Sequence, residues 1–434
     1  MKLNWILHLV LVIGCVTASG QEKLTLSQAV DIALKNNLGI IIAKNNVEAN
    51  DILNTYGVAG GLPAINGALV DNQQVVDINQ KYSDASRDAK THGAKTNNLT
   101  ANITGTIILF NGMKIISTKR QLDAQYLQSK EVLNSQVQNT IAAVMTSYYD
   151  IIRQQSYTGT ISRSIEVSEK RLEILQTQFS VGMANNADIF QARLDLTALQ
   201  QSLTSQQLIV DQAKTDLLTL LTLKPDSVIY VNDSIQVDNT IRLDSVFAQL
   251  DKNADIVAAN YQIRINEMIA RETAAQRYPT VRLNAGYNYS RVQNSAGFNL
   301  LNQSSGAIFG ISLGVPIYNG GAYRREKQAA DIYTENAEVQ KRELVRDYSG
   351  GAVKTFQAYK SALAQLEVER KNYVVAQQLL DLVMQKYEVR QATIIDVREA
   401  QKSFEDAGYR LVNLEFSAKA AEIELKRVTN RLGL

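Results

Sequence analysis

Cysteine and histidine are almost absent from this sequence of 434 residues. The only cysteine is Cys15, and the only histidines are His8 and His92. A disulfide within the chain is therefore impossible, and a metal site built from cysteine and histidine is excluded. Catalysis by a Ser–His or Cys–His pair is disfavoured, because His92 lies in a polar, loop-like tract. Since no acid–base or nucleophile constellation stands out either, we expect the protein to be no enzyme and to bind no cofactor.

An excess of charge of one sign is also missing, since 45 Lys and Arg residues face 43 Asp and Glu residues. The basic footprint of a nucleic-acid-binding protein is therefore absent, and we expect no nucleic-acid partner.

Long hydrophobic runs are confined to the first 20 residues, which have the pattern of a secretory signal peptide. Lys2 precedes an apolar core, and Ala18-Ser19-Gly20 is a small-residue cleavage site before Gln21. The core is too short to span a bilayer as a helix. Two alternatives stay open: an N-terminal membrane anchor, and lipoprotein processing at Cys15, because Val12-Ile13-Gly14-Cys15 loosely fits a lipobox. No later stretch is a candidate transmembrane helix, so any other span would have to be a β-barrel.

Two stretches of the chain are alike. One reads FSVGMANNADIFQAR from Phe179 to Arg193, and the other reads YEVRQATIIDVREAQ from Tyr387 to Gln401. Asp188 and Asp396 align at an offset of 208 (396 − 188) in the numbering. We interpret each stretch as the turn, or tip, between two long antiparallel helices.

The residues after each aspartate predict those helices. Apolar residues recur there at alternating steps of three and four, which is typical of a coiled-coil seam and requires neighbouring helices to cover it. After Asp188 the seam comprises Ile189, Ala192, Leu196, Leu199, Leu203, Val210, Ala213, Leu217 and Leu220, with Gln206 as an interruption. After Asp396 it comprises Val397, Ala400, Phe404, Ala407, Leu411, Leu414, Ala418, Ala421, Leu425, Val428 and Leu432.

The hydrophobic period changes to two after Pro63 and again after Pro279, at an offset of 216 (279 − 63) in the numbering. Residues 64–70, 98–110, 280–291 and 309–315 are predicted strands, of which the first has the weakest pattern, and residues 71–97 and 292–305 are predicted exposed loops. The strand pattern fits a transmembrane barrel with a wet interior and, equally well, a soluble antiparallel sheet with one solvated face. In a barrel, Leu283, Tyr287, Ile311 and Leu313 would face lipid, and Asn284, Asn288, Ser312 and Gly314 would face the lumen.

Each predicted hairpin ends in an aromatic-Asn-Gly sequence, Phe110-Asn111-Gly112 in one case and Tyr318-Asn319-Gly320 in the other. The interval from Asn111 to Asp188 equals the interval from Asn319 to Asp396, and neither contains a proline. These intervals predict two helices of nearly 70 residues, roughly 100 Å long. The chain therefore divides into a signal peptide (1–20), a first structural repeat (21–224), a linker (225–241) and a second structural repeat (242–434).

The doubled organisation, the two Asn-Gly junctions and the tip motif around Val181-Gly182 and Asp188-Ile189 together resemble the TolC outer-membrane efflux family. The resemblance covers nearly all of the chain after the signal. It implies a mixed α/β membrane protein of long antiparallel coiled-coil helices with four β-strands per chain. Three chains would form a homotrimer with a 12-stranded barrel in the outer-membrane lipid and an α-helical tunnel in the periplasm.

The function that the resemblance implies is a passive exit duct of a tripartite efflux or type I secretion system. Its partners would be a periplasmic adaptor, also called a membrane fusion protein, and an inner-membrane pump that selects the substrate. The alternative is a periplasmic or surface coiled-coil scaffold without channel activity.

The tips carry the expected site residues. The adaptor contact would comprise Phe179, Val181, Gly182, Met183 and Ala184 on one tip and Val389, Ala392 and Ile394 on the other, although an ordinary helical hairpin turn would also explain such residues. The family restrains its closed end by contacts between the tips, at positions that Tyr387 and Asp188 match. The family's basic partner is missing near Ala392, and Arg390, which stands where the first tip has Gly182, could replace it.

Asp396 and Glu399 share one helix face, because they lie three residues apart. In a trimer they would form stacked acidic rings at the narrow end, which attract cations. Together with Asp188, Tyr387 and Arg390 they make up the predicted lumen gate. An aspartate at a helix start is also explained by the free backbone N–H groups there, and this explanation stays open for Asp188 and Asp396.

Overall fold

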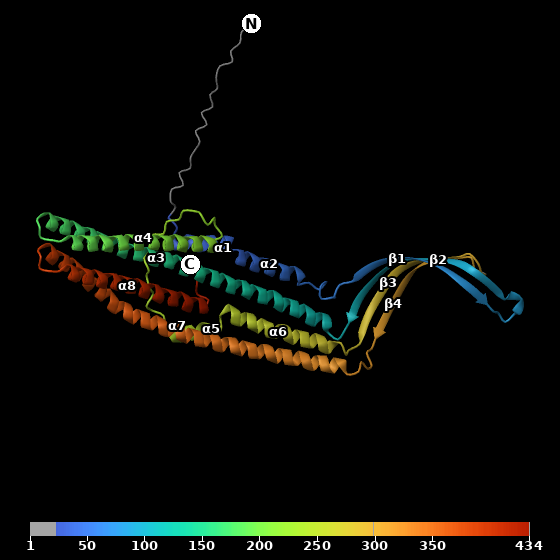
Figure 1. The fold of residues 1–434 in the computed structure, drawn as a ribbon. Helices are drawn as coiled ribbons and strands as arrows, with labels where there is room; N and C mark the ends of the chain where they lie inside the picture. The colour runs from blue at the N-terminus through green and yellow to red at the C-terminus, as the bar shows by residue number, and fades with distance from the viewer. Residues whose placement is uncertain (1–22, 298, 434) are drawn as a thin grey trace, which may run out of the picture. The chain divides into compact units, whose positions relative to one another are not determined.

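The structure is a computed structural model that describes residues 23–297 and 299–433. The predicted signal peptide and Cys15 lie outside the described residues. The helices are α1 (Leu26–Asn36), α2 (Leu38–Leu53), α3 (Lys114–Ser180), α4 (Asn186–Leu220), α5 (Leu243–Leu250), α6 (Ala254–Ala275), α7 (Ala322–Glu388) and α8 (Ile394–Val428). The strands are β1 (Ala64–Gln80), β2 (Ala89–Phe110), β3 (Thr280–Asn294) and β4 (Leu301–Gly314), and a short 3₁₀ helix, η1 (Ala85–Arg87), lies between β1 and β2 (Figure 1).

The chain forms two compact units. The described part of the first unit comprises residues 23–40, 137–248 and 351–433, and it holds α1, α4, α8 and the tip halves of α3 and α7. The second unit comprises Ile41–Gln136 and Gln249–Gly350, and it holds the four strands, α6, most of α2 and the other halves of α3 and α7.

The predicted long helices are confirmed. α3 and α7 are 67 residues long each, and α4 and α8 are 35 residues long each. The seam of α8 is largely buried, including Val397, Ala400, Phe404, Ala407, Ala418, Ala421, Leu425 and Val428. The seam of α4 is buried at both ends, whereas Leu196, Leu199 and Leu203 in the middle are half-buried.

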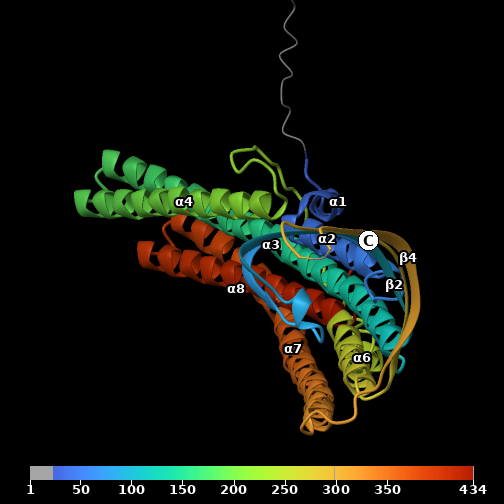
Figure 2. The ribbon, with the colours of Figure 1, turned by 90° about the vertical axis from the view of Figure 1, so that its right-hand side faces the viewer.

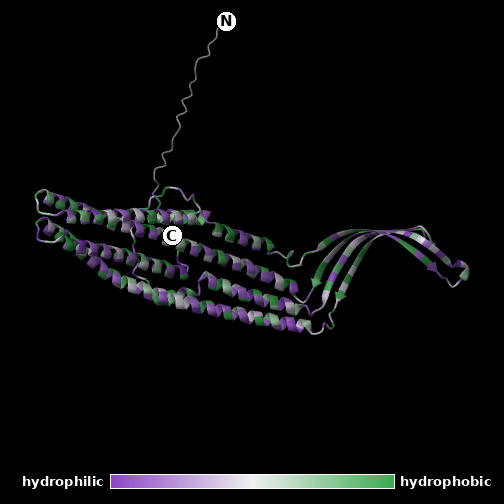
Figure 3. Ribbon diagram, viewed as in Figure 1, coloured by the Kyte–Doolittle hydropathy of each residue, from purple (hydrophilic) through white to green (hydrophobic). Residues whose placement is uncertain are grey.

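Polar and apolar residues alternate along all these helices (Figure 3). Among the described residues, no helix combines the length and the apolar character that crossing a membrane would need.

The four strands form one antiparallel sheet in the order β1-β2-β3-β4, which curves strongly (Figures 1 and 2). The register pairs apolar residues with apolar residues, since Leu283 lies opposite Ile311 and Val281 lies opposite Leu313. The polar face is also continuous, because Asn284 Nδ2 donates to Ser312 Oγ at 3.2 Å. The prediction that the apolar residues share one face of the sheet and the polar residues the other is therefore confirmed.

The loop predictions for residues 71–97 and 292–305 were too long. β1 continues to Gln80 and β2 begins at Ala89, so only residues 81–88 connect them, and residues 295–300 connect β3 with β4. These strand ends are mostly polar, and their few apolar residues, such as the adjacent Val75 and Val76, do not alternate. They therefore lack the pattern that marks a half-buried strand. Main-chain pairing extends the hairpin nonetheless, and it continues from Asn72↔Asn98 to Gln80↔Ala89 with one bulge.

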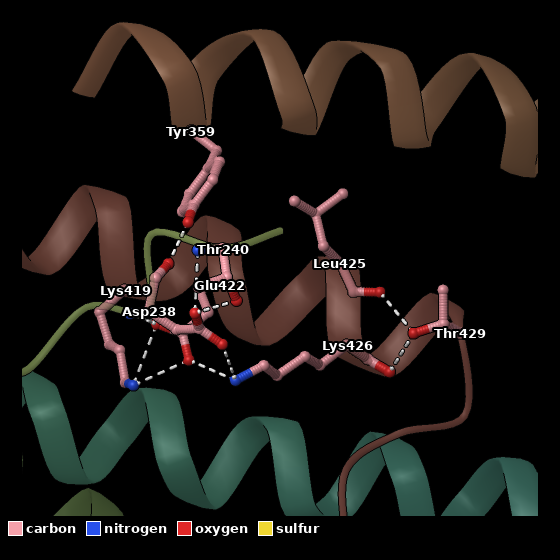
Figure 4. A network of polar contacts seen from close by, with 8 residues as sticks. All are labelled: Asp238, Thr240, Tyr359, Lys419, Glu422, Leu425, Lys426 and Thr429. Atoms are coloured by element: carbon pink, nitrogen blue, oxygen red, sulfur yellow. Dashed lines mark hydrogen bonds and ion pairs between the residues drawn. The ribbon is translucent and has the colours of Figure 1, made fainter. Parts of the chain in front are cut away.

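Residues 225–241, the predicted linker, lie in the first unit and contact an ionic network on α8 whose centre, Glu422, is buried (Figure 4). Lys419 Nζ donates to both carboxylate oxygens of Glu422, at 2.9 and 3.1 Å, and Lys426 Nζ donates to Oε1 of the same carboxylate at 2.8 Å. Glu422 Oε2 also accepts the backbone N–H of Asp238 at 2.9 Å. The Glu422 carboxylate therefore joins the linker to α8, and it is buried.

Two further contacts hold the same point of the linker. The Tyr359 hydroxyl of α7 donates to the backbone carbonyl of Asp238, and burial raises the pKa of Tyr359 to about 12. The Asp238 carboxylate accepts the Thr240 hydroxyl at 2.6 Å and the Thr240 N–H at 3.0 Å. These two hydrogen bonds, together with Lys426, lower the pKa of Asp238 to about 2.

Candidate functional site at the helical tips

The two tips end their long helices in the same way. At the first tip, Gly182 N–H donates to Phe179 O at 2.9 Å and Met183 N–H donates to Gln178 O at 2.8 Å. At the second, Arg390 N–H donates to Tyr387 O at 3.1 Å and Gln391 N–H to Lys386 O at 2.7 Å. Both pairs form a Schellman motif, which places one residue in the left-handed conformation.

That residue is Gly182 at the first tip, with φ of 72°, and Arg390 at the second, with φ of 63°. Glycine adopts this conformation without a steric penalty, whereas arginine does not. Arginine in place of glycine at position 390 therefore leaves the shape of the turn unchanged, and its backbone is strained.

The predicted adaptor residues divide into two groups. Phe179, Val181, Met183 and Val389 are exposed apolar side chains, and Gly182 is exposed with nothing within 4 Å of an added Cβ. Ala184, Ala392 and Ile394 are instead half-buried against the core of the tip. Ile395 and Phe190, which the sequence reasoning missed, are exposed apolar side chains beside them.

The predicted gate residues do not gather into one cluster. Tyr387 is buried beside Ile189 and Val397 in the core of the tip, and this burial raises its pKa. Arg390 is exposed, and its guanidinium lies against Met183 Sδ of the other tip rather than on the Asp188 carboxylate. The two tips are therefore in direct contact, through a different partner from the one expected.

The acidic residues stand at helix starts. Thr393 caps α8, where its N–H donates to Asp396 Oδ2 at 2.7 Å and its hydroxyl accepts the Asp396 N–H at 3.2 Å. These hydrogen bonds from Thr393 lower the pKa of Asp396. Asp188 N–H donates to Asn185, which caps α4, at 2.9 Å. The carboxylate of Asp396 thus takes part in a capping box, whereas Asp188 contributes only its backbone N–H to the cap of α4. The exposed Glu399 lies beyond the cap.

A buried ion pair near the tips was missed. Arg171 of α3 is only 1% exposed, and its Nη2 contacts Asp195 Oδ2 of α4 at 2.8 Å. Arg398 Nε of α8 lies 3.4 Å from the same oxygen, and Gln191 donates to the other oxygen of Asp195 at 2.8 Å. Asp195 therefore joins three helices from both hairpins.

The surroundings of this pair are polar. Arg171 lines a groove of about 890 Å³ together with Asp195, Arg398 and Glu399. Arg171 Nε and Nη1 have no hydrogen-bond partner among the described residues. The spacing of residues in α3 could have indicated that Arg171 is buried. The buried residues of this face follow one another at steps of three and four: Ile161, Ser164, Ser168, Arg171 and Leu175.

Comparison with solved structures defines the class of protein from the fold. The chain is similar to the outer membrane protein VceC of Vibrio cholerae, with a TM-score of 0.76 and 18% identity over 93% of this chain and 96% of that chain. The mostly helical fold with four antiparallel strands is therefore the fold of that outer membrane protein.

The family follows from the sequence. The model of the outer membrane efflux protein family matches residues 29–222 and 248–431. The chain is 22% identical to the outer membrane efflux protein BepC of Brucella suis, over 95% of this chain and 87% of that protein. It is 22% identical to the outer membrane protein TolC of Escherichia coli, over 81% of this chain and 73% of that protein. The chain belongs to the outer membrane efflux protein family, the resemblance to TolC is confirmed, and the outer membrane is its location.

Proposed function

We propose that three copies of this chain form a passive exit duct for a tripartite efflux or type I secretion system. Each copy contributes its four strands to a 12-stranded barrel, and the helices continue the duct through the periplasm. One observation carries the proposal: the sheet has two free edges, β1 and β4, and belongs to a chain of the efflux family. Free main-chain groups at such edges have no water to bind in a bilayer, so closure by further copies satisfies them.

The tips are the proposed docking site of a periplasmic adaptor, which links the duct to an inner-membrane pump. The exposed side chains Phe179, Val181, Met183 and Val389 offer apolar contacts, and Gly182 lets a partner approach the main chain. Ala184, Ala392 and Ile394 support these residues from the half-buried side. The pump selects the substrate, and the duct is open to whatever the pump delivers.

The same tips form the proposed gate. Asp396 and Glu399 of three copies would create two acidic rings, and the exposure of both carboxylates supports this. The contact of Arg390 with Met183 and the packing of Tyr387 near Asp188 would hold the two hairpins together in the closed state.

Electrophoresis of the unboiled protein tests the proposed assembly. A barrel trimer stays intact in detergent until it is boiled, whereas a coiled-coil scaffold runs as a single chain at all temperatures. A heat-sensitive band at three times the chain mass supports the duct, and its absence contradicts it.

The docking role is tested at Gly182 by export in cells. Gly182→Trp should abolish export and leave trimers in the outer membrane, because the side chain blocks the adaptor. Gly182→Ala is the matched control, since it introduces the same left-handed strain with little bulk. Loss of trimers in Gly182→Trp would instead assign Gly182 to folding.

A further inference from the structure

The polar face of the sheet carries a single charged residue where its four strands pair. On this face lie the even-numbered residues of the paired segments, which run from 64 to 76, from 96 to 108, from 282 to 294 and from 302 to 314. All of these even-numbered residues are uncharged except Arg282, whose side chain is exposed. The other charged residues of the same segments, Asp71 and Arg291, have odd numbers and lie on the opposite face.

Arg282 has no carboxylate beside it in the sheet. Ile108 and Ser312 lie directly opposite it on the two adjacent strands. The next residue of β3 on the same face, Asn284, accepts the Thr106 hydroxyl at 3.0 Å and donates to Ser312 Oγ at 3.2 Å. Among the described residues, Arg282 forms no ion pair. Neutral polar groups therefore surround a cation whose charge the chain does not balance.

The carboxylates of the strands lie far from this cation. The strands contain two, Asp71 and Asp77, and both belong to β1. Asp71 pairs with Leu99, and Leu99 pairs with Arg291, nine residues (291 − 282) along β3 from Arg282. At the rise of a β-strand this separation is roughly 30 Å. Asp77 follows Asp71 in the direction away from Arg282, so neither carboxylate can neutralise the guanidinium.

The fold does not require a charge at this position. Pro63 and Pro279 differ by 216 in the numbering, and the same offset makes Asn66 the counterpart of Arg282 (282 − 66). Asn66 is exposed, lies on the polar face of β1 and pairs with Thr104. The first hairpin thus holds a neutral amide where the second hairpin holds a guanidinium. A role for the charge itself, rather than for folding, therefore has to explain Arg282.

Arg282 lies near the end of the sheet that joins the helices. Its strand, β3, begins at Thr280, and only residues 276–279 separate that strand from α6. All of these residues belong to the second unit. If three copies close one barrel with the polar face inside, three guanidinium groups lie at one level of the lumen.

We propose that Arg282 of three copies forms a guanidinium ring in the lumen, which makes the strand section of the duct prefer anions. Rings of arginine or lysine select anions and phosphates in pores, and lumen residues of a barrel tune its selectivity. The planar guanidinium also binds carboxylate and phosphate groups through two parallel hydrogen bonds. The ring therefore favours exported molecules that carry a carboxylate or phosphate group. The inference rests on the proposed duct and adds a charge-selective site to it.

This site has the opposite sign to the tips, where Asp396 and Glu399 form the proposed acidic rings. Ions that cross the whole duct pass both sites, so the selectivity of the duct depends on both. Removal of the guanidinium ring should therefore make the duct more selective for cations, whereas removal of the acidic rings should make it less so.

Reversal potentials in a salt gradient across a planar bilayer test the ring. Arg282→Asn introduces the residue of the first hairpin and should raise the permeability of cations relative to that of anions. Asn66→Arg adds a guanidinium at the equivalent position of β1 and should lower the same ratio. Arg291→Asn is the matched control, because it removes the same charge from the other face of the same strand and should leave the ratio unchanged. Electrophoresis of the unboiled proteins shows which variants form trimers.

Block of the current by pyrophosphate tests the recognition of oxyanions. Pyrophosphate should interrupt the current through the native duct, and Arg282→Asn should abolish this block. Arg282→Lys keeps the charge but lacks the planar fork of donors, so it should keep the native permeability ratio and weaken the block. Equal block of the native duct and of Arg282→Asn would overturn the binding of anionic groups at the ring.

The outcomes separate this inference from the function on which it rests. A native protein that inserts no conducting unit overturns both the duct and the ring. Conducting Arg282→Asn trimers with the native permeability ratio overturn the ring and leave the duct standing, and so does a shift in Arg291→Asn alone. If Arg282→Asn forms no trimers, Asn66→Arg decides, because an unchanged ratio in that variant overturns the ring as well.

Discussion

Gly182 and Arg390 occupy the same position of the same helix-ending motif, one at each tip, with φ of 72° and 63°. The left-handed conformation costs a residue with a Cβ on the order of 1 kcal/mol. Arg390→Gly should therefore stabilise the chain by about 1 kcal/mol, and Gly182→Ala should destabilise it by a similar amount. Urea unfolding followed by helical circular dichroism measures both. A loss of stability in Arg390→Gly would show that the contact with Met183 outweighs the strain.

Asp195 is the only charge that contacts the buried guanidinium of Arg171 among the described residues. Asp195→Leu leaves that cation buried without a partner and should cost about 3–5 kcal/mol, whereas the double variant Arg171→Met/Asp195→Leu should recover most of the loss. Asp211 on the same helix is the control, because its carboxylate is exposed in the ion pair with Lys214 and Asp211→Leu should cost less than about 1 kcal/mol. Equal unfolding midpoints for Asp195→Leu and Asp211→Leu would refute the buried pair.

Asp238 predicts a response to acid. Its pKa is about 2 in the folded chain and 3.8 ordinarily, so the unfolded chain binds its proton first as the pH falls. Its contribution to stability is present well above pH 3.8 and is lost as the pH falls through 3.8 towards about 2. Asp238→Asn should therefore flatten the fall of the melting temperature in this window, as should removal of the donor in Thr240→Val. If the melting temperatures of both variants fall with pH as steeply as that of the native chain, other carboxylates determine the acid sensitivity.

The sheet register predicts unequal tolerance of charge on adjacent residues. Leu313 lies on the apolar face and Ser312 on the polar face with Asn284. If the apolar face meets lipid near the bilayer midplane, Leu313→Lys should cost about 2–4 kcal/mol of barrel stability, and Ser312→Lys should cost much less. Heat resistance of the trimer band on a gel compares the two. Equal tolerance would contradict the assignment of faces.

Asp396 and Glu399 should confer cation selectivity. Asp396→Ala/Glu399→Ala removes both proposed acidic rings, so selectivity for cations and block by multivalent cations should weaken. Alanine also removes the capping contact with Thr393. Asp396→Asn/Glu399→Gln keeps hydrogen-bonding groups of the same shape, and it separates the loss of charge from the loss of the cap. Unchanged selectivity in stable trimers of both variants would leave these residues with a structural role only.

Hydrophobic periodicity predicted most of the fold. Pro63 and Pro279 marked the starts of two hairpins, and the equal, proline-free intervals between the Asn-Gly junctions and the tips predicted the two helices of 67 residues. The strand ends beyond residues 70 and 291 were missed, because mostly polar side chains without an apolar alternation leave no pattern there, although the main chain pairs. The division into two repeats joined by residues 225–241 stays a prediction.

The tips were located from sequence, but their contacts were not. Local spacing placed Phe179, Val181 and Met183 in one turn, and these side chains are exposed there. It could not predict that Arg390 adopts φ of 63° or that its guanidinium reaches Met183 across the chain. Such contacts depend on how two hairpins pack, and no short stretch of sequence contains that information. The spacing along α3 indicates that Arg171 is buried, but its pairing with Asp195 of α4 depends on the same packing and could not be predicted.

Single-channel recording on the purified protein in a planar bilayer tests the proposed duct most directly. The proposal predicts discrete, cation-selective conductance steps from samples in which the trimer is intact, and no steps after boiling. Intact, correctly folded protein that inserts no conducting unit would contradict the duct and favour a scaffold.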